Sequence, residues 1–197
     1  MPRIVDKDAR RDEIIDVTWR IIEREGVDAV TLRRVAAEQG LANGAVKPYF
    51  ASKDELLEAA YLRAFARTNE RAEAAIGELA GLEALRRLAA EIMPLDEERR
   101  TEARIVVAFW ERAVSNERLA RIYRTHTCAW LGELARHLAA ARDAGEVTAS
   151  TPDTVVLDRL MWMMTGLQAM SRLAPELASP ERQRAALDEL LDGLAGE

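Results

Sequence analysis

Residues that could carry out catalysis are few in this 197-residue chain, and their spacing is poor for it. The two histidines, His126 and His137, fall about three turns apart on one predicted helix. Cys128 is two positions from His126, and side chains at that spacing on a helix point to different faces. The sequence contains no H-E-x-x-H, C-x-x-C or G-x-S-x-G motif and no glycine-rich phosphate loop. We therefore expect no enzyme, no metal site and no bound cofactor.

A second set of polar residues gathers around Gly40, and its chemistry suits a nucleic acid. Four cations flank the turn: Arg33, Arg34, Lys47 and Lys53. Arginine and lysine can bind phosphates, whereas an asparagine such as Asn43 can pair with an adenine edge. The set alone is weak support, because acidic residues are almost as numerous in this part of the chain.

Two short helices around a glycine turn would position this set. Thr31 is placed to cap the first helix, and Gly40 fits the left-handed residue at its end. Ala42 to Lys47 is predicted to form a second short helix. Ser52 and Glu55 have the spacing of a capping box at the start of a longer helix. This arrangement is typical of a helix-turn-helix, whose second helix can enter the major groove of DNA.

Over roughly residues 8–60 the sequence resembles the TetR family of bacterial transcription regulators. The matching residues are Gly26 to Leu32, Val35, Ala36, Gly40, Leu41, Gly44, Tyr49, Phe50, Ser52, Lys53, Leu56 and Leu57. The resemblance implies an all-helical dimer with an N-terminal DNA-binding domain and a larger C-terminal domain that binds a small inducer. It also implies DNA contacts from the first turns of the second and third helices, from the aromatic after the recognition helix, and from the Ser-Lys pair.

Motif and resemblance together predict nine DNA-binding residues: Thr31, Arg33, Arg34, Asn43, Gly44, Ala45, Lys47, Tyr49 and Lys53. Asn43, Gly44 and Ala45 would lie at the base edges, and the others, except for Arg34, are assigned to phosphates. Two such DNA-binding domains, one from each subunit, would bind a near-palindrome whose half-sites lie one helical turn, about 34–36 Å, or a multiple apart. Arg3 and Lys7 form a basic arm that could reach a minor groove or be an unstructured tail.

Three residues depart from the usual TetR pattern within the recognition segment. Ala42 stands where a serine or threonine commonly caps the recognition helix. Lys47 replaces a usual tyrosine, and it can reach a phosphate without an aromatic ring's packing. Pro48 lies at the end of the short helix and lacks the N–H that a helix interior needs.

Composition predicts an all-α fold of about nine helices. The chain is 49% hydrophobic, 31% charged and only 5% aromatic, and good helix formers dominate. Residues 1–53 hold 10 basic and 9 acidic residues, net +1, whereas residues 54–197 hold 18 and 25, net −7. A single cysteine suits a reducing cytoplasm, and we expect no leader and no membrane span.

We expect a DNA-binding domain at residues 1–53 and a ligand-binding and dimerisation domain at residues 54–197. Helices are predicted at residues 8–25, 31–40, 42–47, 52–76, 82–93, 101–114, 116–144, 153–173 and from 180 onward, with a charged connection at 96–100. The helix over 52–76 would link the two domains.

The last two helices are predicted to form the interface of a homodimer. Val156, Leu160, Met163, Met164 and Leu167 make the first of them apolar around much of its circumference, more than one buried face requires. A four-helix bundle shared between two chains would cover the surplus, and burial of both faces within one chain is the alternative. The segments 165–169 and 179–182 resemble the C-terminal domain of the BetI-type branch of the family.

Aromatic residues in the C-terminal domain are candidates for an inducer pocket. They are Phe109, Trp110, Tyr123, Trp130, Trp162 and Met163, with core packing as the alternative for each. Such walls suit a cation held over aromatic faces as well as a flat aromatic molecule. The competing hypothesis for the whole chain is a helical adaptor that binds protein and not DNA. Binding to random DNA at two salt concentrations separates the two, because phosphate contacts make DNA affinity fall steeply with salt.

Overall fold

A computed structural model describes residues 6–195, and every regular element in that range is a helix. The elements are α1 (Lys7–Glu25), η1 (Val27–Ala29), α2 (Leu32–Glu38), α3 (Lys53–Ile76), α4 (Gly81–Ile92), α5 (Glu97–Ser115), α6 (Glu117–Asp143), α7 (Asp153–Leu173), η2 (Pro175–Leu177) and α8 (Pro180–Ala195). The all-α prediction is confirmed. The described residues hold eight α-helices where nine were expected, because residues 43–49 form turns.

Side-chain caps define where several helices begin. The Thr31 hydroxyl accepts a hydrogen bond from the Arg34 amide at 3.0 Å, and Ser52 accepts one from Glu55 at 3.2 Å, as predicted. The prediction of a charged connection over 96–100 is wrong. The carboxylate of Asp96 caps α5 by accepting from the Arg99 amide at 2.9 Å, so the helix starts at Glu97.

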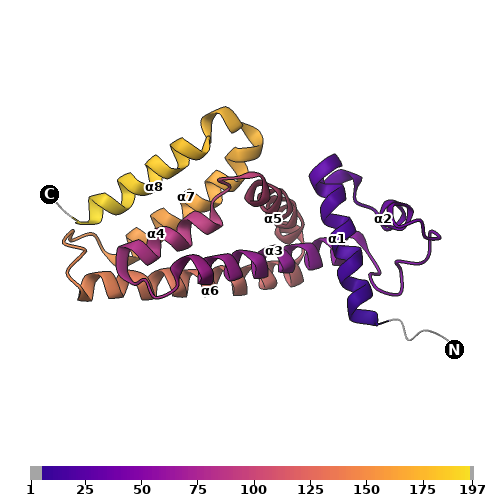
Figure 1. The fold of residues 1–197 in the computed structure, drawn as a ribbon, viewed down its shortest axis with the longest axis horizontal. Helices are drawn as coiled ribbons and strands as arrows, with labels where there is room; N and C mark the ends of the chain where they lie inside the picture. The colour runs from indigo at the N-terminus through magenta and orange to yellow at the C-terminus, as the bar shows by residue number, and fades with distance from the viewer. Residues whose placement is uncertain (1–5, 196–197) are drawn as a thin grey trace.

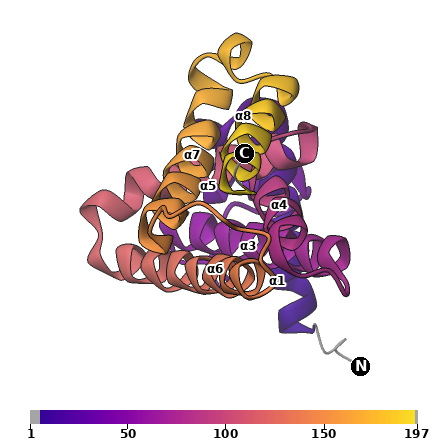
Figure 2. The ribbon, with the colours of Figure 1, turned by 90° about the vertical axis from the view of Figure 1, so that its left-hand side faces the viewer.

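The helices form a small head and a larger body (Figure 1). The head consists of α1, η1, α2 and the turns up to residue 52. From there α3 runs into the body alongside α6, while α5 lies between the head and the rest of the body. Figure 2 shows α7 and α8 together along one side of the body. Because α3 belongs to both parts, a shift of this helix in the body must move the head.

The apolar core does not divide at residue 53, where the sequence suggested a domain boundary. One hydrophobic cluster joins α1, α2 and the first half of α3 to Ile105, Phe109 and Leu119 of the body. A second cluster fills the body with side chains of α4, α6, α7 and α8. Phe50 and Val46 of the head are fully buried in the first cluster. The head is therefore packed directly on α5 as well as carried by α3.

Candidate functional site

The turn after α2 has the geometry that Gly40 predicted. Gly40 has φ +66°, a left-handed conformation that glycine adopts without steric cost. The amide of Leu41 donates to the carbonyl of Ala36 at 2.9 Å, and that of Gly40 donates to Ala37 at 3.0 Å. These bonds satisfy the carbonyl groups at the end of the helix, so the direction of the chain into residue 42 is fixed.

The predicted short helix over Ala42 to Lys47 is wrong, because residues 43–49 form consecutive turns. The amide of Ala45 donates to Ala42 at 2.9 Å and that of Lys47 to Gly44 at 3.2 Å, which is three-residue spacing in both cases. Two departures noted in the sequence explain this. Ala42 has no side chain with which to cap a helix, and Pro48 has no N–H to donate to the Gly44 carbonyl.

The predicted DNA contacts fall into two groups in the structure. Asn43, Gly44, Lys47 and Arg33 are exposed on the turn and the outer side of α2, and no hydrogen bond or ion pair involves the side chains of Asn43, Lys47 or Arg33 within residues 6–195. Ala45 and Tyr49 are half-buried beside them, and the side chain of Thr31 caps α2. Lys53 donates to the carbonyl of Val27 at 3.0 Å.

Arg34 differs from the other predicted cations because carboxylates already surround it. Its guanidinium contacts Glu25 at 2.7 Å and Glu38 at 2.6 Å, and Arg24 contacts the same two glutamates. We call Arg24, Glu25, Arg34 and Glu38 the head ion cluster. Hydrogen bonds from the two arginines lower the pKa of Glu38 to about 2 and also lower the pKa of Glu25.

Arg11 is a residue of the head that the sequence analysis missed. Its guanidinium lies over the Phe50 ring at 4.3 Å and donates to the Tyr49 carbonyl. Through these contacts α1 holds the end of the turn segment. The two positions are 38 residues apart, and no local pattern in the sequence connects them.

The body contains a cavity of about 30 Å³ between α3, α5, α6 and α7. Its lining is mostly aromatic and apolar with a polar end: Tyr61, Ala64, Phe65, Thr68, Ile92, Arg99, Glu102, Ala103, Val106, Trp110, Tyr123, Thr127, Trp130, Met161, Met164, Thr165 and Gln168. Trp110, Tyr123 and Trp130 are the predicted ligand residues that line it. α3 supplies four of the lining residues, so any change in this space acts directly on the helix that carries the head.

The other three predicted ligand residues do not line this cavity. Phe109 is fully buried, and its ring stacks on Tyr61 at 4.1 Å as part of the core. Trp162 is 70% exposed on α7, and Met163 packs at the edge of the second hydrophobic cluster. Phe109 of α5 therefore belongs to the core beside the cavity, and on α7 the face that meets the cavity carries Met161, Met164 and Gln168.

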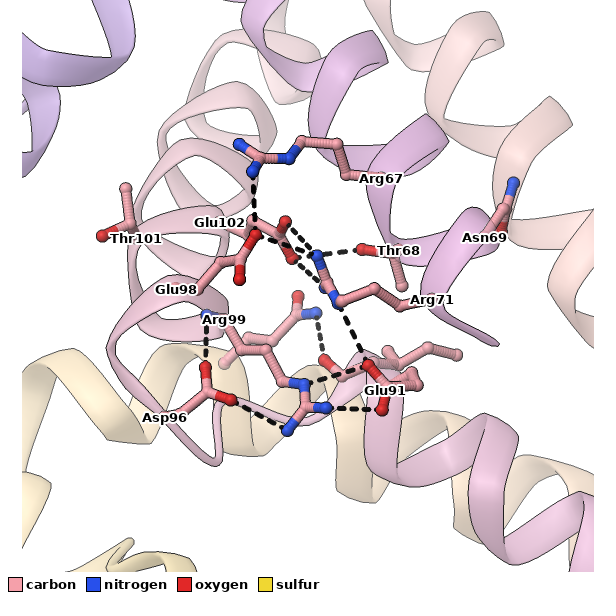
Figure 3. Close-up of polar contacts among 12 residues, drawn as sticks. Arg67, Thr68, Asn69, Arg71, Glu91, Asp96, Glu98, Arg99, Thr101 and Glu102 are labelled. Carbon is pink, nitrogen blue, oxygen red and sulfur yellow. Dashed lines mark hydrogen bonds and ion pairs between the residues drawn. The ribbon is translucent and has the colours of Figure 1, made fainter. Parts of the chain in front are cut away.

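The polar end of the cavity belongs to a buried network of charges (Figure 3). Arg71 of α3 holds Glu102 of α5 through two bonds of 2.8 and 2.6 Å and contacts Glu91 of α4 at 3.1 Å. Glu91 also pairs with Arg99 of α5. We call Arg71, Glu91, Arg99 and Glu102 the body ion cluster. Two of its carboxylates, Glu91 and Glu102, are buried, and the sequence pattern alone did not single them out.

The residues weighed for catalysis serve packing instead. His126 lies against the rings of Phe65 at 4.0 Å and Tyr61 at 5.7 Å, and burial lowers its pKa. His137 is buried elsewhere on α6, and Cys128 is exposed. Within the described range no group of three His, Cys, Asp or Glu residues could hold a metal ion, and no helix there is long and apolar enough to cross a bilayer.

The fold and the site together define a helix-turn-helix regulator whose helical body contains an internal cavity. Residues 14–60 match the model of the bacterial regulatory proteins of the tetR family, and residues 81–196 match the C-terminal domain of BetI-type transcriptional repressors. The chain therefore belongs to the TetR family, with a BetI-type C-terminal domain. Proteins of this family are transcription regulators and not enzymes.

Individual relatives agree with this assignment. The chain is 26% identical to the transcriptional regulator PksA of Bacillus subtilis over 100% of its own length and 95% of that protein. It is 31% identical to BetI of Burkholderia mallei over 64% of this chain and 66% of that protein. A regulator from Saccharomonospora viridis, solved in complex with choline, has the same fold with a TM-score of 0.85 at 22% identity, covering 94% of this chain and 96% of that one.

Proposed function

We propose that this ligand-responsive DNA-binding regulator acts in the cytoplasm as a homodimeric repressor that leaves a near-palindromic operator when a small molecule enters its body. One observation supports the proposal most strongly. α3 begins at Lys53 next to the exposed turn, with Ser52 as its cap, and its middle forms part of the cavity wall, where it supplies Tyr61, Phe65 and Thr68. A single rigid element thus joins the surface that would meet DNA to the space that would meet the inducer.

The division of labour on DNA that we propose rests on side-chain chemistry and on position within the turn segment. Asn43, Gly44 and Ala45 lie at the tip of the turn segment, where base edges would come within reach. Thr31, Arg33, Lys47, Tyr49 and Lys53 surround them and would hold phosphates. The turns over 43–49 would tighten into a recognition helix in the major groove, since bound DNA supplies partners that the free segment lacks.

The α7 part of a dimer interface through α7 and α8 is supported by exposed apolar side chains on α7 and η2. Trp162 and Leu173 of α7 are 70% and 80% exposed, and Leu177 in η2 is 52% exposed. Val156, Leu160 and Met164, which the sequence suggested as surplus apolar surface, are buried within the chain instead. The exposed stripe through Trp162 is the better candidate for the twofold contact, because apolar patches of this kind mark interaction sites.

The inducer would have to expand its site. A cavity of about 30 Å³ holds roughly one water molecule, so a ligand enters only if lining side chains or the helices that carry them move. Such a ligand would favour a body whose two α3 helices hold the heads at the wrong spacing. Choline, which the Saccharomonospora regulator binds, is a reasonable first probe for aromatic walls next to a carboxylate, and a flat aromatic compound is the second.

Selection of bound sequences from a random DNA pool tests the proposal. We expect a near-palindrome whose half-site spacing reports a dimer. Asn43→Ala should change the selected sequence, whereas Lys53→Ala should weaken binding to all sequences alike. Equal effects of both substitutions would contradict the division between bases and phosphates. A monomer that binds no duplex at low salt would contradict the whole proposal and favour the adaptor.

A further inference from the structure

Trp130 of α6 stands between two hollow regions of the body. On one side is the cavity of about 30 Å³ described above. On the other is an open groove of about 640 Å³ between α3, α4 and α6, lined by Phe65, Asn69, Ala72, Glu73, Ile76, Gly77, Leu88, Ala129, Trp130, Glu133 and Arg136. Phe65 and Trp130 line both spaces. These two side chains therefore form the partition between the cavity and the open groove.

Two specific contacts hold the partition closed. The Trp130 indole N–H donates to the Asn69 side-chain oxygen on α3 at 2.8 Å. The Phe65 and Trp130 rings are stacked, with centroids 4.9 Å apart and planes 29° from parallel. Asn69 projects from α3 on the side away from the ion pairs of Arg71, as Figure 3 shows. The bond to Asn69 is thus independent of the body ion cluster and can break without disturbing it.

We propose that Trp130 is a gate through which the inducer passes from the groove into the cavity. The proposal rests on the proposed function, because it assumes that the cavity receives a ligand. The indole lies along the groove and is only half-buried, so rotation toward the groove moves it into open space and not into packed core. With the gate open, groove and cavity form one site, which would admit a molecule far larger than the closed cavity holds.

This geometry also assigns Trp130 a role in selectivity. A ligand that keeps its own aromatic or cationic group against Phe65 replaces the stacked contact that the displaced indole gives up. A ligand without such a group opens the gate but does not replace the stacked contact between Phe65 and Trp130. The Asn69 side-chain oxygen, freed from the indole N–H, would accept a hydrogen bond from a polar group of the ligand, since an amide that a ligand covers without pairing is unfavourable. Trp130 thus favours inducers that have an aromatic or cationic end next to a hydrogen-bonding group.

Thiol accessibility tests the gate without inducer or DNA. In a Cys128→Ser background, Ala103→Cys places a single thiol at a cavity-lining position of α5 that is 2% exposed. Its rate of reaction with a methanethiosulfonate reagent reports opening of the cavity. Trp130→Ala should raise the rate by about tenfold or more, as expected for loss of a partly buried hydrogen bond and a stacked contact. Trp130→Phe and Asn69→Ala, which leave no large void, should each raise it by a smaller factor.

Met161→Ala is the matched control, because Met161 lines the cavity from α7 but does not line the groove. It enlarges the cavity and leaves the partition intact, so the thiol should stay nearly as protected as in the parent. Equal rates in Met161→Ala and Trp130→Ala, or unchanged rates in both Trp130→Phe and Asn69→Ala, would overturn the gate. Operator binding measured on the same proteins tests the proposed function separately, since neither result depends on the other.

Discussion

The head and the body each contain a cluster of two arginines and two glutamates, and the two clusters differ in environment. In the head, Arg24 and Arg34 each contact both Glu25 and Glu38, and the four side chains are 22–52% exposed. In the body, the contacts run as a chain from Glu102 through Arg71 and Glu91 to Arg99, and the side chains are only 7–24% exposed. The same arginine–glutamate ion pairs are thus partly exposed to water in the head and mostly buried in the body.

The difference shows how one chain can use the same pairing for two purposes. Charges in water interact weakly and exchange partners easily, so a DNA phosphate could replace a carboxylate beside Arg34. Charges in the interior are held firmly, because each would be left unpaired if its partner moved. The head ion cluster is therefore adaptable, and the body ion cluster fixes α3, α4 and α5 relative to one another at the polar end of the cavity.

The largest expected effect comes from breaking the body ion cluster. Glu102→Ala leaves the Arg71 guanidinium without the bidentate partner that it has in the folded protein. Loss of one member of a buried pair typically lowers the free energy of unfolding by about 3 kcal/mol, and urea denaturation measures it. Glu102→Gln, which keeps the shape and can still accept from Thr68, should cost less. A loss for Glu102→Ala no larger than that for Glu38→Ala would erase the distinction between the clusters.

The next largest effect concerns the two neighbouring arginines of α2. Arg33 is exposed and unpaired within residues 6–195, whereas Arg34 already contacts two carboxylates. Arg33→Ala should reduce the slope of log affinity against log salt for random duplex DNA by about one. Arg34→Ala should reduce it by less, because only part of that charge is available to phosphate. Fluorescence anisotropy over a salt series gives both slopes, and equal reductions would show that DNA displaces the carboxylates completely.

A smaller effect is expected from adding an N-cap side chain at position 42, before the turn segment of residues 43–49. Thr31 caps α2 with its side chain, whereas Ala42 offers nothing to the segment that follows. Ala42→Ser supplies a hydroxyl at that position, and a cap of this kind contributes about 1 kcal/mol. We expect higher helix content by circular dichroism. We also expect tighter operator binding, because residues 43–49 would already be partly helical before they bind DNA. Unchanged helix content would show that Pro48 alone prevents the helix.

The sequence predicted the local features well and the tertiary ones poorly. The caps by Thr31 and Ser52 and the left-handed Gly40 depend on neighbouring residues, and each lies where its local chemistry requires. The burial of Glu102 depends on Arg71, which is 31 residues away. The spacing of charges along one helix cannot reveal such a partner. The buried carboxylates and the membership of the cavity wall depend on contacts between helices, whereas the start of α5 at Glu97 depends on the local cap by Asp96.

Two tryptophans of the body, Trp130 and Trp162, show the same limit. Trp130 lines the cavity, whereas Trp162 is 70% exposed on α7. In the sequence Trp162 is flanked by methionines and looks more like a core residue than Trp130 does. What separates them is which side of each helix meets α3, and that depends on how four helices pack. The aromatic character of the cavity could be predicted from composition, but only three of the six predicted residues, Trp110, Tyr123 and Trp130, line it.

The smallest effect, and the finest test of the comparison, is the response of the head ion cluster to pH and salt. Its arginines hold the pKa of Glu38 at about 2, below the ordinary value of 4.5. A lowered pKa in the folded state means that the stabilisation is complete above about pH 5 and is lost as the pH falls toward 2. The difference in urea midpoint between the parent and Glu38→Gln should therefore shrink over that range.

The same difference in urea midpoint should also shrink in high salt at neutral pH, because exposed charges are screened. The difference between the parent and Glu102→Gln should respond much less to salt, because that carboxylate is shielded from solvent. If both differences fell equally with salt, the body cluster would be as accessible to ions as the head cluster, and burial would not explain their separate roles.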